Sequence, residues 1–177
     1  AVPQRSRYRN RCRMRKKLEF ILAGTEVTRY HTVRTLVQET VGHHSHGVAM
    51  LCLFLAPDAS ANLLKAALVH DLAEHVLGDI PAPSKREFGI GEQVNKLEDM
   101  LLSQHNLDPV ITKEEARILK LADIAQGALF CIRELSLGNS GIKIVLQRYI
   151  SYADSMILSG VERELFDLIK ALYQEVA

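Results

Sequence analysis

Apolar residues recur at intervals of three and four along most of the chain, and alternating runs of β-branched residues are few. This period places apolar side chains along one face of an α-helix, so the sequence predicts an all-α protein. Because no internal repeat or low-complexity linker divides residues 18–177, we expect them to form a single domain. The expected helices span residues 14–23, 41–55, 59–77, 91–105, 112–137, 141–158 and 161–176.

Several of the expected helices have recognisable ends. Gly78 follows the third helix, and glycine tolerates the left-handed conformation that commonly ends a helix. Thr112 and Glu115 have the spacing of a capping box, which would open the long fifth helix. Residues 25–40 and the proline-containing segment 79–83 are expected to be loops.

The composition is that of a globular protein. A chain of 177 residues can bury about 70% of the surface it exposes when unfolded, so it needs neither disulfides nor a structural metal. Cys12, Cys52 and Cys131 lack CxxC spacing, which indicates a reducing compartment and excludes a thiolate zinc site. No apolar run approaches the roughly 20 residues of a membrane span, and no signal peptide is recognisable. We therefore expect a soluble, cytoplasmic protein.

The charges are distributed unevenly. Residues 1–17 carry eight arginines and lysines and no acid, although the net charge of the whole chain is only +1. Such a basic arm can attract a phosphate backbone, but a solvated peripheral tail is the plainer interpretation. Nucleic-acid binding is therefore not expected, and we treat residues 1–17 as a peripheral arm.

Residues 70–74 carry the first candidate chemistry. His70 and Glu74 lie one helical turn apart on a shared face, and Asp71 is rotated by about 100° from His70. Imidazole and carboxylate together suit a divalent cation such as Mn²⁺, Fe²⁺, Co²⁺, Ni²⁺ or Zn²⁺. This pattern is compatible with a catalytic metal site that keeps open positions for water and substrate.

Two further positions add candidate ligands. The cluster His43-His44-Ser45-His46 begins an apolar helix, where one of the three imidazoles can face inward. Asp123 stands among apolar residues and needs a partner if it is buried. Each feature has a plain alternative, because His-Asp pairs arise by chance and a core aspartate is often merely hydrogen-bonded. Their conjunction favours a metal site.

The order of these residues resembles that of the HD-domain phosphohydrolases, in particular the bacterial 5′-deoxynucleotidases and the small phage dATP triphosphohydrolases. The resemblance runs in one register from about residue 22 to residue 135, which leaves out the basic arm. It implies a compact HD-domain helical bundle. The segments that carry it are 29–34 (RYHTVR), 38–45 (QETVGHHS), 70–74 (HDLAE), 78–85 (GDIPAPSK) and 120–123 (KLAD).

The resemblance implies the roles of the central residues. Glu74 falls on the acid/base residue that orders or deprotonates the attacking water. The cation, one of Mn, Co, Zn, Mg, Ni or Fe, would lower the pKa of that water and screen the phosphoryl oxygens. The implied metal ligands are His44, His70, Asp71 and Asp123.

The resemblance also implies a set of substrate contacts. Arg29 would bind phosphate through its planar fork of donors, and Lys85 would add a second positive charge. Asp79 would accept a hydrogen bond from the 3′-hydroxyl of the sugar, or else cap a turn. The complete set is Arg29, Tyr30, Thr32, Arg34, Asp79 and Lys85.

Three of these contacts depart from the family or stay open. Tyr30 stands where the relatives commonly have Trp, and Thr32 replaces a larger apolar residue that shapes the adenine pocket of the phage enzymes. Arg34 would reach a distal phosphate or lie in solvent.

The short chain and His31, where the bacterial enzymes have Pro, favour the phage group. The sequence interpretation is thus a deoxynucleoside triphosphate triphosphohydrolase that converts dATP to deoxyadenosine and triphosphate. The first alternative is a 5′-deoxynucleotidase acting on deoxynucleoside monophosphates. A nucleotide-binding regulatory module is the alternative from another class, although the presence of Glu74 argues against it. A purely structural helical bundle would leave the register shared with the family unexplained. The relatives also imply a homo-oligomer, a dimer or a hexamer, in the cytoplasm, or in the host cytoplasm for a phage protein.

Overall fold

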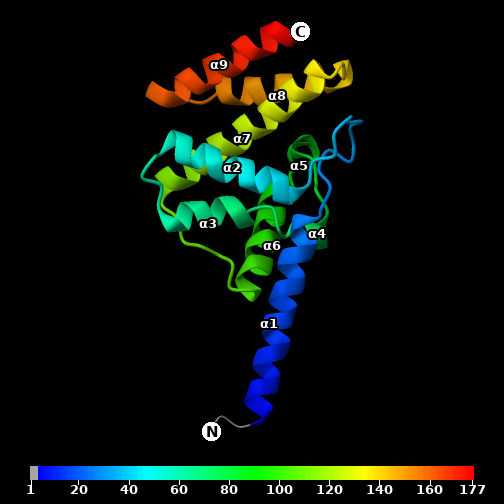
Figure 1. Cartoon of the computed structure of the whole chain (residues 1–177), viewed down its shortest axis with the longest axis vertical. Helices are drawn as coiled ribbons and strands as arrows, with labels where there is room; N and C mark the ends of the chain where they lie inside the picture. The colour runs from blue at the N-terminus through cyan, green and yellow to red at the C-terminus, as the bar shows by residue number, and fades with distance from the viewer. Residues whose placement is uncertain (1–3) are drawn as a thin grey trace.

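The structure is a computed structural model that describes residues 4–177 (Figure 1). Within these residues the only β-structure is an isolated bridge between Thr28 and Thr40, so the predicted all-α class is confirmed. The helices are α1 (Gln4–Thr25), α2 (Val41–Leu55), α3 (Ala61–Val69), α4 (Glu74–Leu77), α5 (Ala82–Glu87), α6 (Gly91–Gln104), α7 (Lys113–Ser136), a 3₁₀ turn η1 (Ser140–Ile142), α8 (Lys143–Asp154) and α9 (Gly160–Val176).

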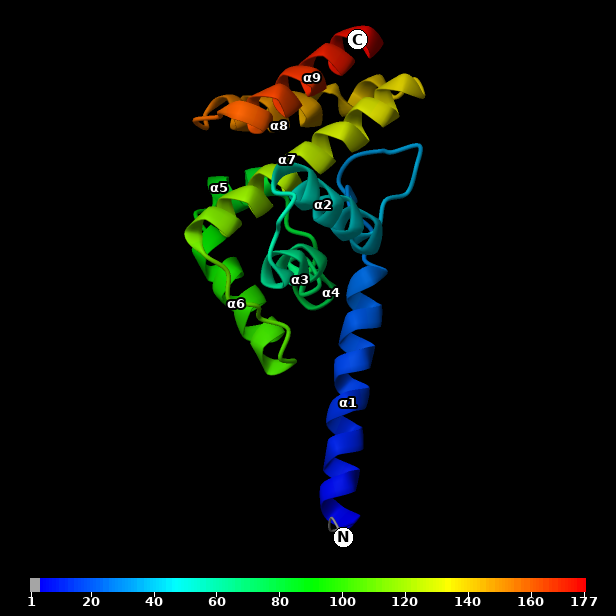
Figure 2. The ribbon, with the colours of Figure 1, turned by 60° about the vertical axis from the view of Figure 1, so that its left-hand side comes forward.

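Helix α7 is the central element of the bundle. It packs against α2, α3, α8 and α9, and α2 in turn packs against α3. Figures 1 and 2 show α8 and α9 stacked at the end of the molecule opposite to α1. Residues such as Leu121, Leu146 and Ile169 join α7, α8 and α9 in one apolar cluster, and Val48 and Leu63 join α2 and α3 in another. The two clusters fix α2, α3 and α7 relative to one another.

Two local predictions agree with the structure. Helix α2 has the predicted bounds. The capping box at the start of α7 is present, because the Glu115 N–H donates to the Thr112 hydroxyl at 3.1 Å and the Thr112 N–H donates to the Glu115 carboxylate at 2.7 Å. Both features depend on contacts between neighbours in the sequence, which a pattern can specify.

The prediction of one helix over residues 59–77 is wrong. Helix α3 ends at Val69, a tight turn covers residues 70–73, and α4 begins at Glu74. In this turn the N–H of Leu72 donates to Val69 and the N–H of Glu74 donates to Asp71, which are three-residue rather than four-residue steps. The apolar period continues across the turn, so the pattern does not reveal it.

The segment 79–83, predicted as a loop, runs into the short helix α5. Pro81 caps α5 and Pro83 lies in its first turn, where a missing N–H costs no helical hydrogen bond. The first helix is also longer than the predicted 14–23. From Gln4 onward the basic segment is part of α1, whose N-terminal half extends away from the bundle (Figure 2).

Lys17 and Phe20, in the second half of α1, contact the bundle. Lys17 donates to the carbonyl of Asn106, and Phe20 packs against His75 and His105. No helix within residues 4–177 has the length and apolar character needed to cross a membrane. The three cysteines are free.

Candidate metal centre

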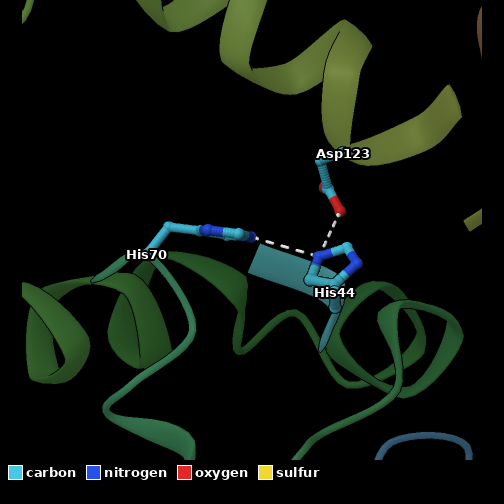
Figure 3. A group of neighbouring side chains, drawn as sticks. All are labelled: His44, His70 and Asp123. Carbon is cyan, nitrogen blue, oxygen red and sulfur yellow. Dashed lines mark hydrogen bonds and ion pairs between the residues drawn. The ribbon is translucent and has the colours of Figure 1, made fainter. Parts of the chain in front are cut away.

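Three parts of the fold bring the predicted ligands together. His44 comes from α2, His70 and Asp71 from the turn between α3 and α4, and Asp123 from α7. Figure 3 shows His44, His70 and Asp123 directed at one another. The Nε2 atom of His44 lies 3.3 Å from Nε2 of His70 and 3.3 Å from Oδ1 of Asp123.

Asp71 completes the group. Its Oδ2 atom lies 3.3 Å from Nε2 of His70 and 3.5 Å from Nε2 of His44. His43 and His46 are exposed, whereas His44 is fully buried. Of the three clustered histidines, His44 is the one whose imidazole lies within 3.5 Å of the other candidate ligands.

The hydrogen bonds of the two imidazoles define which nitrogens are free. The Nδ1 atom of His44 lies 2.5 Å from Oε1 of Gln126, and Nδ1 of His70 lies 2.9 Å from the carbonyl oxygen of Ala67. Both partners are acceptors, so both Nδ1 atoms carry a ring proton, and each ring in its neutral form directs an Nε2 lone pair into the site. Two such lone pairs and two carboxylates repel one another unless a cation lies among them. The donor set therefore fits a divalent metal.

The pKa values indicate the same excess of negative charge. Burial alone would lower the pKa of His70, but the carboxylates of Asp71 and Asp123 raise it to about 9. Burial opposes ionisation of Asp123, yet its contacts with His44 and Lys120 hold its pKa well below the usual range. Burial likewise opposes ionisation of Asp71, but His70 and Arg29 lower its pKa. Both carboxylates are thus ionised at neutral pH, and the site attracts positive charge.

Glu74 lies at the first position of α4, next to this group. Its side chain is only 8% exposed, and its Oε2 atom has no hydrogen-bond partner among the described residues. Burial raises its pKa to about 9, and the neighbouring carboxylates of Asp71 and Asp79 add to the shift. A buried, unpaired carboxyl group on a cavity wall is suited to proton transfer.

Arg29 connects the loop 25–40 to the metal-ligand group. Its Nη1 atom donates to Oδ2 of Asp71 at 2.5 Å, and its Nε atom lies 3.4 Å from Oε2 of Glu39. Glu134 of α7 holds the same loop, since its carboxylate accepts the N–H groups of Leu36 and Val37 at 2.7 Å each. Arg29 is therefore held by Asp71 and Glu39, and the loop that carries it is held to α7 by Glu134.

A cavity of about 300 Å³ opens over the site. Lys85 lies on its wall, with Nζ 3.1 Å from the carboxylate of Glu98. Arg34 does not line the cavity: its side chain is exposed and its carbonyl accepts a hydrogen bond from Asn139. The predicted site residues that line the cavity are Arg29, Tyr30, Thr32, Asp71, Glu74, Asp79, Lys85 and Asp123.

One wall of the cavity is aromatic. Tyr30 has a positive φ of 59°, which is unusual for a residue with a large side chain. Its ring stacks on Phe130 with centroids 4.7 Å apart, and its hydroxyl lies 3.2 Å from that of Tyr149. The structure thus uses Tyr30 to form a flat apolar surface beside the metal-ligand group.

The sequence analysis missed several residues around the cavity. Lys120, Arg148, Tyr149 and Tyr152 also line it, and the last three come from α8, outside the matched segments. Glu39 and Glu134, which hold the loop, were missed as well. Glu134 stands in the apolar run of α7, and a carboxylate in such surroundings needs a buried partner. That signal was available in the sequence.

Comparison with known proteins supports this description. The family model for the HD domain matches residues 26–123. The chain is 31% identical to the 5′-deoxynucleotidase yfbR of Photorhabdus temperata, over 69% of this chain and 75% of that one. It is also 31% identical to the 5′-deoxynucleotidase YfbR of Salmonella typhi, over 69% of this chain and 74% of that one.

Two solved structures share the fold. One is the HD phosphohydrolase DatZ of cyanophage S-2L, bound to dA and one catalytic Zn²⁺ ion, with a TM-score of 0.66 and 20% identity over 89% of this chain and 96% of that one. The other is the PH0347 protein of Pyrococcus horikoshii, with a TM-score of 0.68 and 20% identity over 90% and 98% of the two chains.

The fold and the converging donor set define a metal-dependent phosphohydrolase. The chain belongs to the HD-domain family. The predicted resemblance to the deoxynucleotidase and phage phosphohydrolase group is thereby confirmed.

Proposed function

We propose that the chain is a 5′-deoxynucleotidase, which hydrolyses a 2′-deoxynucleoside 5′-monophosphate to the deoxynucleoside and phosphate. The observation that carries the proposal is the convergence of two imidazoles and two carboxylates beside the unpaired carboxyl of Glu74, on a cavity lined by Arg29. The relatives named 5′-deoxynucleotidase support the monophosphate as substrate. We therefore place this activity ahead of the triphosphohydrolase favoured by the sequence analysis.

His44, His70, Asp71 and Asp123 would hold the divalent cation. When bound, the cation supplies Lewis acidity that lowers the pKa of water and neutralises phosphoryl charge. Lys120 donates to Oδ2 of Asp123 at 2.8 Å, so it balances part of the negative charge from the cavity wall.

Glu74 performs the proton transfers in this proposal. Its carboxylate, favoured in the ionised form by a neighbouring cation, accepts a proton from the attacking water. The water oxygen bonds to phosphorus while the bond from phosphorus to the 5′ oxygen breaks. The leaving oxygen then takes the proton from Glu74, and deoxynucleoside and phosphate are released.

The remaining wall residues would bind the substrate. Arg29 offers its guanidinium to the phosphate oxygens, and Lys85, which also lines the cavity, adds positive charge. Asp79 would accept a hydrogen bond from a sugar hydroxyl, with Tyr30 packed beside the nucleoside and Thr32 at the cavity edge. The exposed side chain of Arg34 is available only to a group that extends out of the cavity.

A triphosphohydrolase is the second candidate, because two arginines favour it. Arg86 and Arg148 line the catalytic cavity and also an adjoining one of about 390 Å³. Neither forms an ion pair among the side chains described from residue 10 onward. A triphosphate carries about four negative charges, and cations at the cavity mouth would stabilise it.

A panel of substrates and metals tests the proposal. The purified protein is incubated with Mn²⁺, Co²⁺, Zn²⁺ or Mg²⁺ and with dAMP, AMP or dATP, and the products are identified. We expect deoxyadenosine and phosphate from dAMP. Release of inorganic triphosphate from dATP, with dAMP left intact, would favour the second candidate. Absence of product with every metal and nucleotide would contradict both and favour the regulatory module.

A further inference from the structure

Gln126 contacts the metal-ligand group from its outer side. It lies on α7 one turn after Asp123, and its Oε1 atom is 2.5 Å from Nδ1 of His44. Gln126 is not among the residues that line the cavity, so it does not face the substrate. Its direct contact with a candidate ligand is with the imidazole of His44.

The other end of the Gln126 amide is also bonded. Its Nε2 atom donates to Oε1 of Glu39 at 2.7 Å, and Glu39 is only 6% exposed. Because the amide donates to Glu39, its oxygen must face His44, which fixes the direction of the amide. The acceptor then selects the His44 tautomer with the proton on Nδ1.

The chain of contacts continues to a second candidate ligand. Oε2 of Glu39 lies 3.4 Å from Nε of Arg29, and Nη1 of Arg29 donates to Asp71. Gln126, Glu39 and Arg29 thus form a path from His44 to Asp71 that runs behind the metal-ligand group. The step from Glu39 to Arg29 is an ion pair and not a hydrogen bond, since Oε2 of Glu39 and Nε of Arg29 have no hydrogen-bond partner among the described residues. The two ligands are therefore linked through hydrogen bonds at both ends of the path and through charge in its middle.

The packing of α2 against α7 leaves Gln126 little freedom. Gly47 lies three residues after His44, and a Cβ atom at position 47 would lie 2.8 Å from Cγ of Gln126. Real Cβ contacts are essentially never that short, so a larger residue at position 47 would displace the amide. Gly47 is therefore part of the arrangement that holds Gln126 against His44.

We propose that Gln126 is a positioning residue that fixes the tautomer and orientation of His44 and, through Glu39 and Arg29, couples His44 to Asp71. The inference rests on the metal site of the proposed function and not on its substrate. A merely structural glutamine would affect stability alone. A positioning glutamine affects the affinity of the folded protein for metal.

Substitutions that move the negative charge from position 39 to position 126 test the network. In Gln126→Glu the carboxylates at positions 126 and 39 repel each other, so the side chain at position 126 moves away from the Nδ1 proton of His44. In the double variant Gln126→Glu with Glu39→Gln, the amide at position 39 again donates to the carboxylate at position 126. The matched control is Gln104→Glu, which makes the same change at the exposed end of α6.

The readouts are the affinity for Mn²⁺, measured by isothermal titration calorimetry on the full-length chain, and the thermal unfolding of the metal-free protein. We expect Gln126→Glu to weaken Mn²⁺ binding by about 10- to 100-fold, the usual effect of losing a partner of a ligating histidine. The double variant should return to within about threefold of wild type, because the two sites are directly coupled. Gln104→Glu should bind as wild type does.

The outcomes separate this inference from the proposed function. Wild-type affinity in Gln126→Glu, or a double variant no tighter than that single variant, would overturn it. If Gln126→Glu does not fold, Gly47→Ala displaces the same amide and must weaken Mn²⁺ binding to support the inference. Failure of the wild-type protein to bind Mn²⁺, Co²⁺ or Zn²⁺ would instead refute the metal centre itself.

Discussion

At the scale of single residues, charge and hydrogen bonding separate the roles of neighbouring carboxylates. Asp71 and Asp123 each contact imidazole nitrogens and a basic side chain, so they are held ionised. Glu74 is buried beside them, and one of its oxygens has no partner among the described residues. Asp71 and Asp123 are therefore suited to holding a cation, and Glu74 is suited to proton transfer.

Substitution of these carboxylates should therefore give different results. Glu74→Ala should lower kcat by about 10²- to 10⁴-fold, the usual range for loss of a general acid/base, while Mn²⁺ binding is retained. Asp71→Ala should lose both turnover and Mn²⁺ binding because it removes a metal ligand. Phosphate release from dAMP and calorimetric metal titration check the two variants. Equal Mn²⁺ affinity in Glu74→Ala and Asp71→Ala would refute the assigned roles.

Glu134 provides a test of stability against pH. Burial opposes its ionisation, but the N–H groups of Leu36 and Val37 and the amide of Asn139 lower its pKa. A lowered pKa in the folded state stabilises the protein above the unfolded value of about 4.3, and this contribution is lost as the pH falls through the folded value.

We expect Glu134→Gln to lower the free energy of unfolding at pH 7 by about 2 kcal/mol, since hydrogen bonds to a charged acceptor are lost. The difference between wild type and variant should shrink below about pH 4. Urea unfolding of both proteins at pH 7, 5 and 3.5 measures this difference in the free energy of unfolding. A difference that stays constant over this range would show that the charge of Glu134 does not hold the loop.

At the scale of elements, local signals were sufficient for some helices and insufficient for the site. The apolar period and the caps predicted α2 and the start of α7. The ligand set was predicted from the resemblance, but not the turn at residues 70–73 that directs it. That turn depends on contacts from distant segments, as does the loop 25–40, which is held by Glu134 about a hundred residues away. A sequence pattern can show that a residue such as Glu134 needs a buried partner, but it does not identify that partner.

Gly24 is one of these distant contacts. A Cβ atom at position 24 would lie 2.7 Å from the carbonyl oxygen of Leu72, in the turn that carries His70 and Asp71. Gly24→Ala should therefore shift the turn and weaken Mn²⁺ binding. The control is Gly91→Ala, since a Cβ atom at position 91 meets nothing within 4 Å. Calorimetric titration compares the two, and unchanged affinity in Gly24→Ala would contradict the role of this packing.

At the scale of the whole molecule, the catalytic cavity and the basic arm lie in separate regions. The cavity is lined by residues from the loop 25–40, α4, α5, α7 and α8, together with the segments at the ends of α3 and α4. Side-chain contacts of α1 with the bundle include those of Lys17 and Phe20, in its second half (Figure 2). The division into an arm and a domain remains a prediction, as does the homo-oligomer.

Removal of residues 1–13 tests this division. The shortened chain should keep the kcat and the Mn²⁺ affinity of the full chain, because Lys17 and Phe20 still anchor α1. Light scattering on both chains reports the oligomeric state in the same preparations. A large loss of kcat, or a change in assembly that accompanies it, would show that the arm contributes to the active assembly.

The central claim is that side chains from α2, the turn at residues 70–73 and α7 hold one divalent cation. Anomalous X-ray diffraction from crystals grown with Mn²⁺ locates such an ion directly. We predict a peak in contact with the Nε2 atoms of His44 and His70 and with the carboxylates of Asp71 and Asp123. A protein that hydrolyses dAMP with its metal bound elsewhere, or with no ion at these side chains, would contradict the account.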